Sequence, residues 1–296
     1  MTKVLVTGSS GFIGQHLMRE LGAKGYDAAG VSTQQSADSI YECDIAQFEQ
    51  IDAVVDNFRP DVVIHTAGIA AVTAADVLRY YSVNVIGTEN LLEALRRTGA
   101  QTRLLFLSTA GVYGNRDAEF LSEALAPQPV SHYGFSKFSC ERLVENYIDE
   151  VVYTTIRPFN IIGPGQNPSF LVPKLVSTFA RGERTIKLGN LDVLRDFMDV
   201  RVSAEKIVSL IERESSFGEQ VNLCTGVATS LYSLIKDLED IAGYEIEIEQ
   251  AVGLVRRSEV WRLVGCPLKL RALLDDRSEP TPVRDILLEM MTLYRH

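Results

Sequence analysis

The sequence predicts an α/β fold in which a doubly wound parallel sheet is joined to a smaller C-terminal α/β lobe. Strand-like and helix-like segments alternate through about the first 160 residues, and this alternation is typical of βαβ units covered by helices on both faces. The first strand-like segment leads directly into a glycine-rich turn. Beyond residue 166 the segments become shorter and are punctuated by proline and glycine, which indicates a second, smaller part.

The individual elements follow from hydrophobic spacing and from the residues at their ends. Residues 3–8 are rich in valine and leucine and are predicted to form a buried strand. In residues 12–25 the apolar side chains recur at helical spacing and the pattern ends at a glycine, which predicts a helix. The same criteria predict strands at 26–32, 60–68, the start of 102–114 and 151–160, and helices at 48–58, 75–98, 132–149 and 230–243.

A glycine-rich turn joins the first predicted strand to the first predicted helix. The stretch "TGSSGFIG" places Gly8, Gly11 and Gly14 at GxxGxxG spacing. Glycines allow a sharp turn and let the backbone approach a pyrophosphate, whose charge is met by the helix N-terminus. The position of this turn predicts a Rossmann-type dinucleotide site.

The change of pattern after residue 165 predicts the division into domains. Residues 1–165 are expected to form the dinucleotide-binding domain, with a returning segment near 196–215. Residues 166–195 and 216–296 are expected to form the substrate-binding lobe. Because no flexible linker separates the two parts, we expect them to pack tightly.

Composition argues against several classes of function. The formal net charge of −10 disfavours a surface that follows nucleic-acid phosphates. No apolar run approaches the ~20 residues of a membrane span, and the N-terminal segment turns glycine-rich too early for a signal peptide. The four cysteines and four histidines lack metal-ligand spacing. We therefore expect a cytoplasmic protein without a metal site and without nucleic-acid or membrane partners.

Residues 131–137, "SHYGFSK", place Tyr133 four residues before Lys137. On a helix these two side chains share a face. A phenol with a pKa of ~10 is a poor acid or base near neutral pH, and a neighbouring ammonium stabilises the phenolate. The pair is either part of a solvated helix surface or a candidate for proton transfer.

The glycine turn and the Tyr-x-x-x-Lys pattern together resemble extended short-chain dehydrogenases/reductases, in the NAD-dependent epimerase/dehydratase family. "VIHTAG", "LSTAGVYG" and "ECDI" resemble a cofactor loop, the loop with the catalytic hydroxyl and the aspartate of the adenine pocket. The resemblance implies Thr109, Tyr133, Lys137 and Asn84 as catalytic residues. The cofactor-binding residues that it implies are Gly8, Ser10, Gly11, Phe12, Ile13, Gly14, Ser32, Asp44, Ile45, Thr66, Ala67, Gly68 and Lys137.

The end of the second predicted strand bears on which nicotinamide cofactor is used. NAD-specific enzymes carry an acid there to hold the adenosine ribose, whereas this chain reads "GVSTQQS". Ser32 and Thr33 can donate hydrogen bonds to a 2′-phosphate. The sequence therefore favours NADP(H) over NAD(H) and leaves dual use open.

The second part of the chain carries the residues expected to bind substrate. "RPFNIIGPGQ" resembles the corresponding segment of GDP-mannose dehydratases and, more closely, of reductases that act on GDP-linked 4-keto-6-deoxymannose. The resemblance implies that Asn160, Arg195, Arg256 and Glu259 bind a nucleotide sugar, and arginine forks suit phosphate oxygens. The chain departs from the pattern at "LLDDRSEPTP" and at Trp261, which leaves the nucleobase and the sugar open.

The loop after Thr109 bears on the type of reaction. A 4,6-dehydratase needs two further acid/base groups, and the resemblance places them at Ala110 and Gly111, which cannot transfer protons. A 4-reductase is favoured, a 4-epimerase with retained NAD is the alternative, and a non-catalytic nucleotide-sensing protein is a remote one. The resemblance also implies a homodimer formed by a four-helix bundle, with helices near 75–98 and 132–149.

Overall fold

The computed structural model describes residues 1–34, 40–70, 77–250 and 259–294. Of the residues predicted for the sites, Arg256 lies outside these ranges. None of the helices formed by the described residues has both the length and the apolar character that crossing a bilayer requires.

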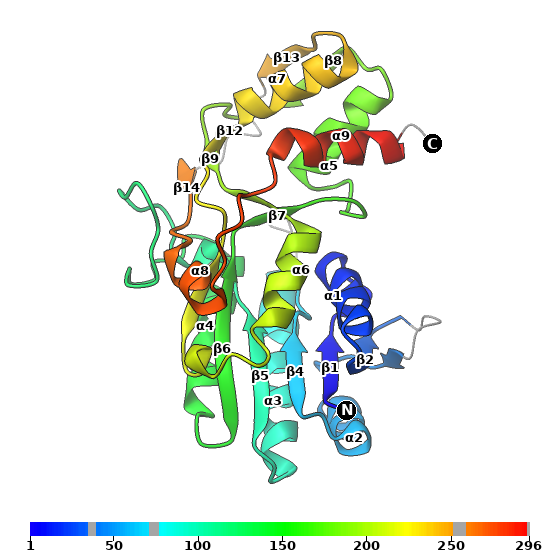
Figure 1. Cartoon of the computed structure of the whole chain (residues 1–296), viewed down its shortest axis with the longest axis vertical. Helices are drawn as coiled ribbons and strands as arrows, with labels where there is room; N and C mark the ends of the chain where they lie inside the picture. Colours follow the sequence, from blue (N-terminus) through cyan, green and yellow to red (C-terminus); the bar gives the residue numbers. More distant parts are fainter. Residues whose placement is uncertain (35–39, 71–76, 251–258, 295–296) are drawn as a thin grey trace.

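A seven-stranded sheet forms the centre of the larger part (Figure 1). Its neighbouring strands are all parallel, which confirms the predicted doubly wound α/β fold. The strand order, β11-β6-β5-β4-β1-β2-β3, reverses between β1 and β4, and ligands bind such sheets beyond the carboxyl ends of the strands at the reversal. The strands are β1 (Lys3–Thr7), β2 (Asp27–Ser32), β3 (Ile40–Glu42), β4 (Val62–His65), β5 (Thr102–Leu107), β6 (Val151–Pro158) and β11 (Gln220–Leu223).

Helices cover both faces of this sheet because its strands are apolar on both sides. Val4 and Val6 of β1 belong to one buried cluster, and Leu5 between them belongs to another. Successive side chains of a strand point to opposite faces, so each face needs its own helical layer. The first cluster includes residues of α1 (Phe12–Ala23) and α6 (Val200–Ser209), and the second includes residues of α2 (Phe48–Phe58), α3 (Gly87–Arg97) and α4 (His132–Asn146).

The helix predicted over 75–98 differs from the structure at its beginning. Tyr80–Ile86 form a π-helix, η1, and the regular helix α3 follows it. The start of α3 packs closely on Ile45, because a Cβ at Gly87 would lie 2.6 Å from Ile45 Cδ1. A π-turn accommodates one more residue than an α-turn and is frequent at functional sites. In this chain it contains Asn84.

The smaller part packs three helices against short strand pairs, at the top of Figure 1. Its helices share one buried core with the strands around them. The helices are α5 (Leu171–Ala180), α7 (Leu231–Ala242) and α9 (Val283–Tyr294). The paired strands are β7 (Asn160–Ile162) with β10 (Phe197–Asp199), β8 (Thr185–Leu188) with β13 (Glu247–Gln250), and β9 (Leu194–Arg195) with β12 (Thr229–Ser230) and β14 (Arg262–Leu263).

The chain returns from the lobe to the larger part more than once. Helix α6 packs against α1, and β11 then extends the large sheet beside β6. A short helix, α8 (Leu268–Leu274), packs against β11. The exact domain division stays a prediction. The predicted range of the lobe, 216–296, includes β11, but this strand lies in the large sheet. Four residues were too short a run to reveal this pairing from the sequence.

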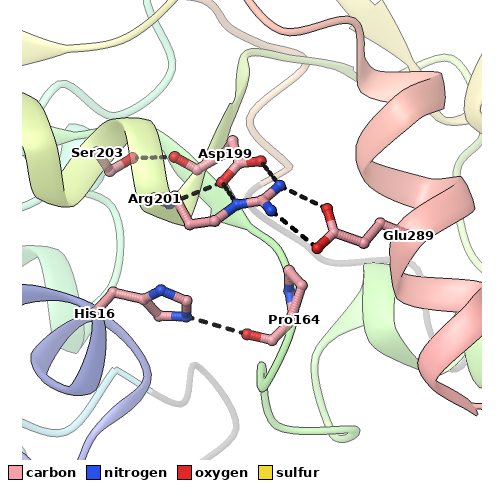
Figure 2. A network of polar contacts seen from close by, with 6 residues as sticks. All are labelled: His16, Pro164, Asp199, Arg201, Ser203 and Glu289. Carbon is pink, nitrogen blue, oxygen red and sulfur yellow. Dashed lines mark hydrogen bonds and ion pairs between the residues drawn. The ribbon is translucent and has the colours of Figure 1, made fainter. Parts of the chain in front are cut away.

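A polar network connects the two parts (Figure 2). The guanidinium of Arg201 in α6 donates to Asp199 Oδ2 at 2.6 Å and to Glu289 Oε2 of α9 at 2.6 Å. His16 Nε2 of α1 lies 3.3 Å from the carbonyl oxygen of Pro164. The pair between Arg201 and Glu289, which joins the two parts, is exposed at both ends. Such pairs contribute only about 0–1 kcal/mol, so this contact defines an orientation more than it adds stability.

Candidate active site

The glycine-rich turn leaves β1 at Gly8, which adopts a left-handed backbone conformation with φ of 74°. A Cβ at Gly8 would lie 2.8 Å from the backbone nitrogen of Ala67, and one at Gly14 would overlap the carbonyl oxygen of Gly8. A side chain at Gly8 would force the turn away from the loop after β4, and one at Gly14 would force α1 away from the turn. Gly8 and Gly14 therefore allow the turn to contact the β4 loop on one side and α1 on the other.

Helix α1 begins beyond this turn with its backbone N–H groups available to an anion. Gly11 occupies the N-cap position, and among the described residues no side chain caps the helix and no acid lies in its first turn. The positive end of the helix dipole favours negative charge here. The turn through Ser10, Phe12 and Ile13 thus fits the pyrophosphate of a nicotinamide dinucleotide.

The end of β2 lies beside this turn. Ser32 is buried, and its hydroxyl lies 2.5 Å from Ser10 Oγ and accepts a hydrogen bond from Gln34 N at 3.2 Å. Asp44 Oδ1 accepts a hydrogen bond from Ala46 N at 3.0 Å. The predicted adenosine end of the site is therefore lined by serine hydroxyls at β2 and by the turn that contains Asp44.

The loop after β4 is held against β1. Thr66 Oγ1 donates to the carbonyl oxygen of Thr7 at 2.7 Å, and Ala67 N donates to Thr7 Oγ1 at 3.3 Å. A Cβ at Gly68 would lie 3.0 Å from Asn84 Oδ1 and 3.9 Å from Lys137 Nζ. The loop consequently connects the glycine turn to the residues predicted as catalytic.

Tyr133 and Lys137 lie in the first turns of α4, as the sequence predicts. Ser131 is the N-cap, and its hydroxyl accepts a hydrogen bond from Gly134 N at 3.1 Å. Lys137 is only 4% exposed, its Nζ lies 4.5 Å from the centroid of the Phe106 ring, and no described carboxylate comes within ion-pair distance. Burial lowers the pKa of Lys137. An ammonium held in this way can donate to the hydroxyls of a ribose.

Burial dominates the electrostatics of Tyr133. Burial raises the pKa of Tyr133 to about 12, and a side-chain hydrogen bond with Thr109 acts in the opposite direction. Desolvation of the phenolate is the largest effect on this pKa. The phenol is protonated at neutral pH and is suited to donate a proton.

Thr109 lies two residues after the end of β5 and is the N-cap of a short 3-10 turn, Ala110–Val112. Its Oγ1 accepts a hydrogen bond from Gly111 N at 3.0 Å, so the hydroxyl proton can be donated elsewhere. Ala110 is buried beside it. The positions that follow Thr109 carry no acid or base, as the sequence shows.

Asn84 uses its side chain to connect two segments. Its Oδ1 accepts from Ile69 N at 2.8 Å, and its Nδ2 donates to Ser136 Oγ at 3.0 Å. Ser136 Oγ donates to the carbonyl oxygen of Tyr133 at 2.8 Å. Asn84 thus shapes the site by tying the β4 loop to α4. Ser136 was not predicted from the sequence, although its position three residues after Tyr133 places it near the same helix face.

A buried ion pair behind Thr109 was also not predicted. Arg157 of β6 donates to Glu141 Oε1 at 2.9 Å and to Oε2 at 2.7 Å, and both side chains are about 1% exposed. Ser108 Oγ donates to Glu141 Oε1 at 2.5 Å, and Arg157 Nη1 donates to Tyr113 Oη at 3.1 Å. The pair anchors α4 to the sheet one turn after Lys137. An arginine within a predicted buried strand was its only signal.

Three of the predicted substrate residues lie on different segments: Asn160 begins β7, Arg195 ends β9, and Glu259 precedes β14, which pairs with β9. Arg195 Nη2 donates to Glu259 Oε1 at 3.4 Å, and Asn190 Nδ2 donates to Glu259 Oε2 at 3.3 Å. Asn160 Nδ2 donates to the carbonyl oxygen of Asp196 at 3.0 Å. The structure therefore brings Asn160, Arg195 and Glu259 into one region.

The sequence profile of the "NAD dependent epimerase/dehydratase family" matches residues 4–224, which include the glycine turn, Thr109, Tyr133 and Lys137. The chain belongs to this family. The GDP-6-deoxy-D-talose 4-dehydrogenase of Aggregatibacter actinomycetemcomitans is 38% identical over 290 residues, which cover 97% of this chain and 96% of that protein. The GDP-6-deoxy-D-mannose reductase of Pseudomonas aeruginosa is 34% identical over 281 residues, which cover 90% and 89%.

Solved structures of epimerase/dehydratase proteins share this architecture. RMD from Pseudomonas aeruginosa, complexed with NADPH, superposes with a TM-score of 0.86 at 30% identity and covers 100% of this chain and 98% of that one. The UDP-glucose 4-epimerase of Thermus thermophilus, in complex with NAD, superposes with a TM-score of 0.88 at 26% identity and covers 99% of each chain. This chain accordingly shares its family and its fold with proteins that are named for reactions of nucleotide sugars and that are solved with NADPH or NAD.

Proposed function

We propose that the protein is an NAD(P)-dependent 4-reductase of a nucleotide-linked 4-keto-6-deoxyhexose, with a GDP-linked sugar favoured. The observation that carries this proposal is the combination of Thr109, Tyr133 and Lys137 with Ala110 and Gly111. The trio suffices for hydride transfer at C4, whereas the two small residues lack the groups that dehydration needs. The names of the two GDP-sugar relatives support the same substrate class.

When bound, the reduced nicotinamide would supply the hydride for C4 of the sugar. Tyr133 donates its phenolic proton to O4, so that the C=O bond becomes CH–OH, and Thr109 donates a hydrogen bond that orients O4 toward the phenol. Lys137 holds the nicotinamide ribose through its ammonium. The raised pKa of Tyr133 keeps the proton on the phenol until the oxygen accepts it.

For the cofactor we propose a preference for NADP(H), with NAD(H) also accepted. The end of β2 offers Ser32 and Thr33 where an NAD-specific enzyme would have an acid. Ser32 Oγ already pairs with Ser10 Oγ at 2.5 Å, which places two hydroxyls beside the glycine turn. The structural relatives are complexed with NADPH in one case and with NAD in the other.

For the substrate we propose that Arg256 and Asn160 contact the diphosphate and that Glu259 binds the ribose hydroxyls of the nucleotide. Arg195 is proposed to face the nucleotide phosphates or the ribose. The half-buried ion pair between Arg195 and Glu259 supports this assignment, because it holds a phosphate donor next to a hydroxyl acceptor. Replacing Arg195 by methionine should raise KM for the nucleotide sugar more than it lowers kcat.

We also propose a homodimer formed by η1, α3 and α4. Leu78, Ile86 and Phe135 are 77%, 52% and 48% exposed, and all three lie on or beside these elements. Large exposed apolar side chains gathered in this way are typical of interaction sites. Light scattering coupled to size exclusion should give twice the monomer mass, and Phe135→Glu should reduce it toward the monomer.

Cofactor retention and turnover test the proposed reaction. Denatured protein is assayed for released nicotinamide, and native protein is mixed with NADPH or NADH and a panel of 4-keto-6-deoxyhexose nucleotides. Reversible cofactor uptake with oxidation of NAD(P)H by a keto sugar supports the reductase. Tightly retained NAD without net oxidation would instead identify a 4-epimerase. If Tyr133→Phe leaves the cellular function unchanged, the nucleotide-sensing alternative is correct.

A further inference from the structure

A chain of buried hydrogen bonds runs beneath the proposed nicotinamide site. Thr7 Oγ1 at the end of β1 lies 2.6 Å from His65 Nδ1, and His65 Nε2 lies 3.0 Å from Thr88 Oγ1. Thr88 Oγ1 then donates to the main-chain carbonyl oxygen of Asn84 at 2.6 Å. All four residues are at most 1% exposed.

The donors and acceptors at the two ends determine where the protons lie. Ala67 N donates to Thr7 Oγ1 at 3.3 Å, and the Thr7 hydroxyl proton is then available for His65 Nδ1. Because the Thr88 hydroxyl donates to Asn84, its oxygen accepts the proton of His65 Nε2. If Nδ1 carried the ring proton instead, the Thr7 hydroxyl proton would have no acceptor among the described residues. The imidazole is consequently the neutral Nε2–H tautomer.

The far end of the chain reaches the helix that carries Tyr133 and Lys137. The carbonyl oxygen of Asn84 also accepts a hydrogen bond from Cys140 Sγ of α4 at 3.1 Å, while the Asn84 side chain bonds Ser136 of the same helix. Residues of β1, β4, η1, α3 and α4 are thereby connected through one imidazole. The glycine turn and the proton donor lie at opposite ends of this connection.

We propose that His65 is a positioning residue, which with Thr7 and Thr88 sets the distance between the cofactor-binding turn and the proton donor Tyr133. The imidazole makes two hydrogen bonds in fixed directions, to Thr7 of β1 and to Thr88 of α3, so a shift of β1 relative to α3 would break one of them. His65 itself does not exchange a proton with substrate. Burial and the charge of Lys137 lower the pKa of His65 to about 3, which keeps the ring neutral at working pH.

The first test compares two variants of Thr88 with a matched control. Thr88→Val removes the hydroxyl at nearly unchanged volume, whereas Thr88→Ser keeps the hydroxyl and removes the methyl group. The control is Thr155→Val, which alters a buried threonine whose Oγ1 has no partner among the described residues. Turnover is followed with NADPH and a GDP-linked 4-keto-6-deoxyhexose, so this arm rests on the proposed function. Thr88→Val should lower kcat about 10-fold to 100-fold, with KM for the sugar nucleotide unchanged, and Thr88→Ser and Thr155→Val should resemble the parent protein.

The second test does not depend on any reaction. Histidine labelled with ¹⁵N is incorporated, and the signals of His65 are assigned by their loss in His65→Phe. We expect a neutral imidazole with the proton on Nε2 in the parent protein and in Thr88→Ser, and a mixed tautomer in Thr88→Val. If no sugar turns over but these signals are as expected, the proposed function fails while the positioning chain stands.

Three results would overturn the inference. A cationic or Nδ1–H imidazole in the parent protein contradicts the proton arrangement. A Thr88→Ser variant that is more impaired than Thr88→Val shows that packing of the methyl group matters and the hydrogen bond does not. Equal kcat in all three variants shows that the chain does not position Tyr133.

Discussion

Replacing Arg157 by methionine should destabilise the fold strongly, because it leaves a carboxylate buried without its counter-charge. The guanidinium makes three hydrogen bonds, two to Glu141 and one to Tyr113. After the substitution, Ser108 remains as a hydrogen-bond donor to Glu141, but it carries no charge. Breaking a buried pair from one side costs about 3–5 kcal/mol, which is a large part of the about 5–15 kcal/mol that stabilises a typical protein.

The measurement is equilibrium unfolding in urea, with an exposed ion pair as control. Arg181 pairs with Glu183, and the two side chains are 58% and 47% exposed, so Arg181→Met should cost less than about 1 kcal/mol. The double variant Arg157→Met/Glu141→Gln should recover much of the lost stability, because the uncompensated charge is gone. If Arg157→Met changes the free energy of unfolding no more than Arg181→Met, the assignment of a buried, mutually dependent pair is wrong.

Further predictions concern the site itself. Tyr133→Phe should lower turnover about 10²-fold to 10⁴-fold while fluorescence titration shows unchanged NADPH affinity; a loss of affinity instead would assign the tyrosine to cofactor binding. Because the pKa of Tyr133 is raised to about 12, the phenol stays protonated over pH 6–9, and kcat/KM for reduction should be flat there; an alkaline decline near pH 7–8 would contradict this. Gly14→Ala should abolish NADPH binding, since its methyl group would overlap the carbonyl oxygen of Gly8, whereas Gly22→Ala, where nothing described lies within 4 Å, should bind normally.

Local signals in the sequence were sufficient for the framework of the site. The strand and helix around the glycine turn, and the four-residue spacing of Tyr133 and Lys137, are set by neighbours in the chain. The family follows from such local motifs in a fixed order. The spacing of apolar residues also predicts a helix where η1 lies, but it cannot distinguish a π-helix from an α-helix, because it carries no information about hydrogen-bond geometry.

The polar contacts between distant segments could not be predicted in the same way. His65 meets Thr7 across 58 positions and Thr88 across 23, and no periodic pattern relates them. The pairing of β11 with β6 could not be predicted either, because the first segments of the lobe separate these two strands in the sequence. Nor could the effect of burial on the pKa of Tyr133 be predicted, because burial depends on the packed structure.

The path of the chain between its two parts determines how substrate recognition can be exchanged among relatives. Helix α5 and strands β8 and β9 precede the return through α6 and β11, whereas α7, β13 and β14 follow it. A hybrid protein in which this chain is joined to a relative at a single point within α6 or β11 would therefore take half of its lobe from each parent. Transplanting the lobe of a relative requires two separate inserts, with α6, β11 and the Arg201 side of the contact to Glu289 retained from the recipient.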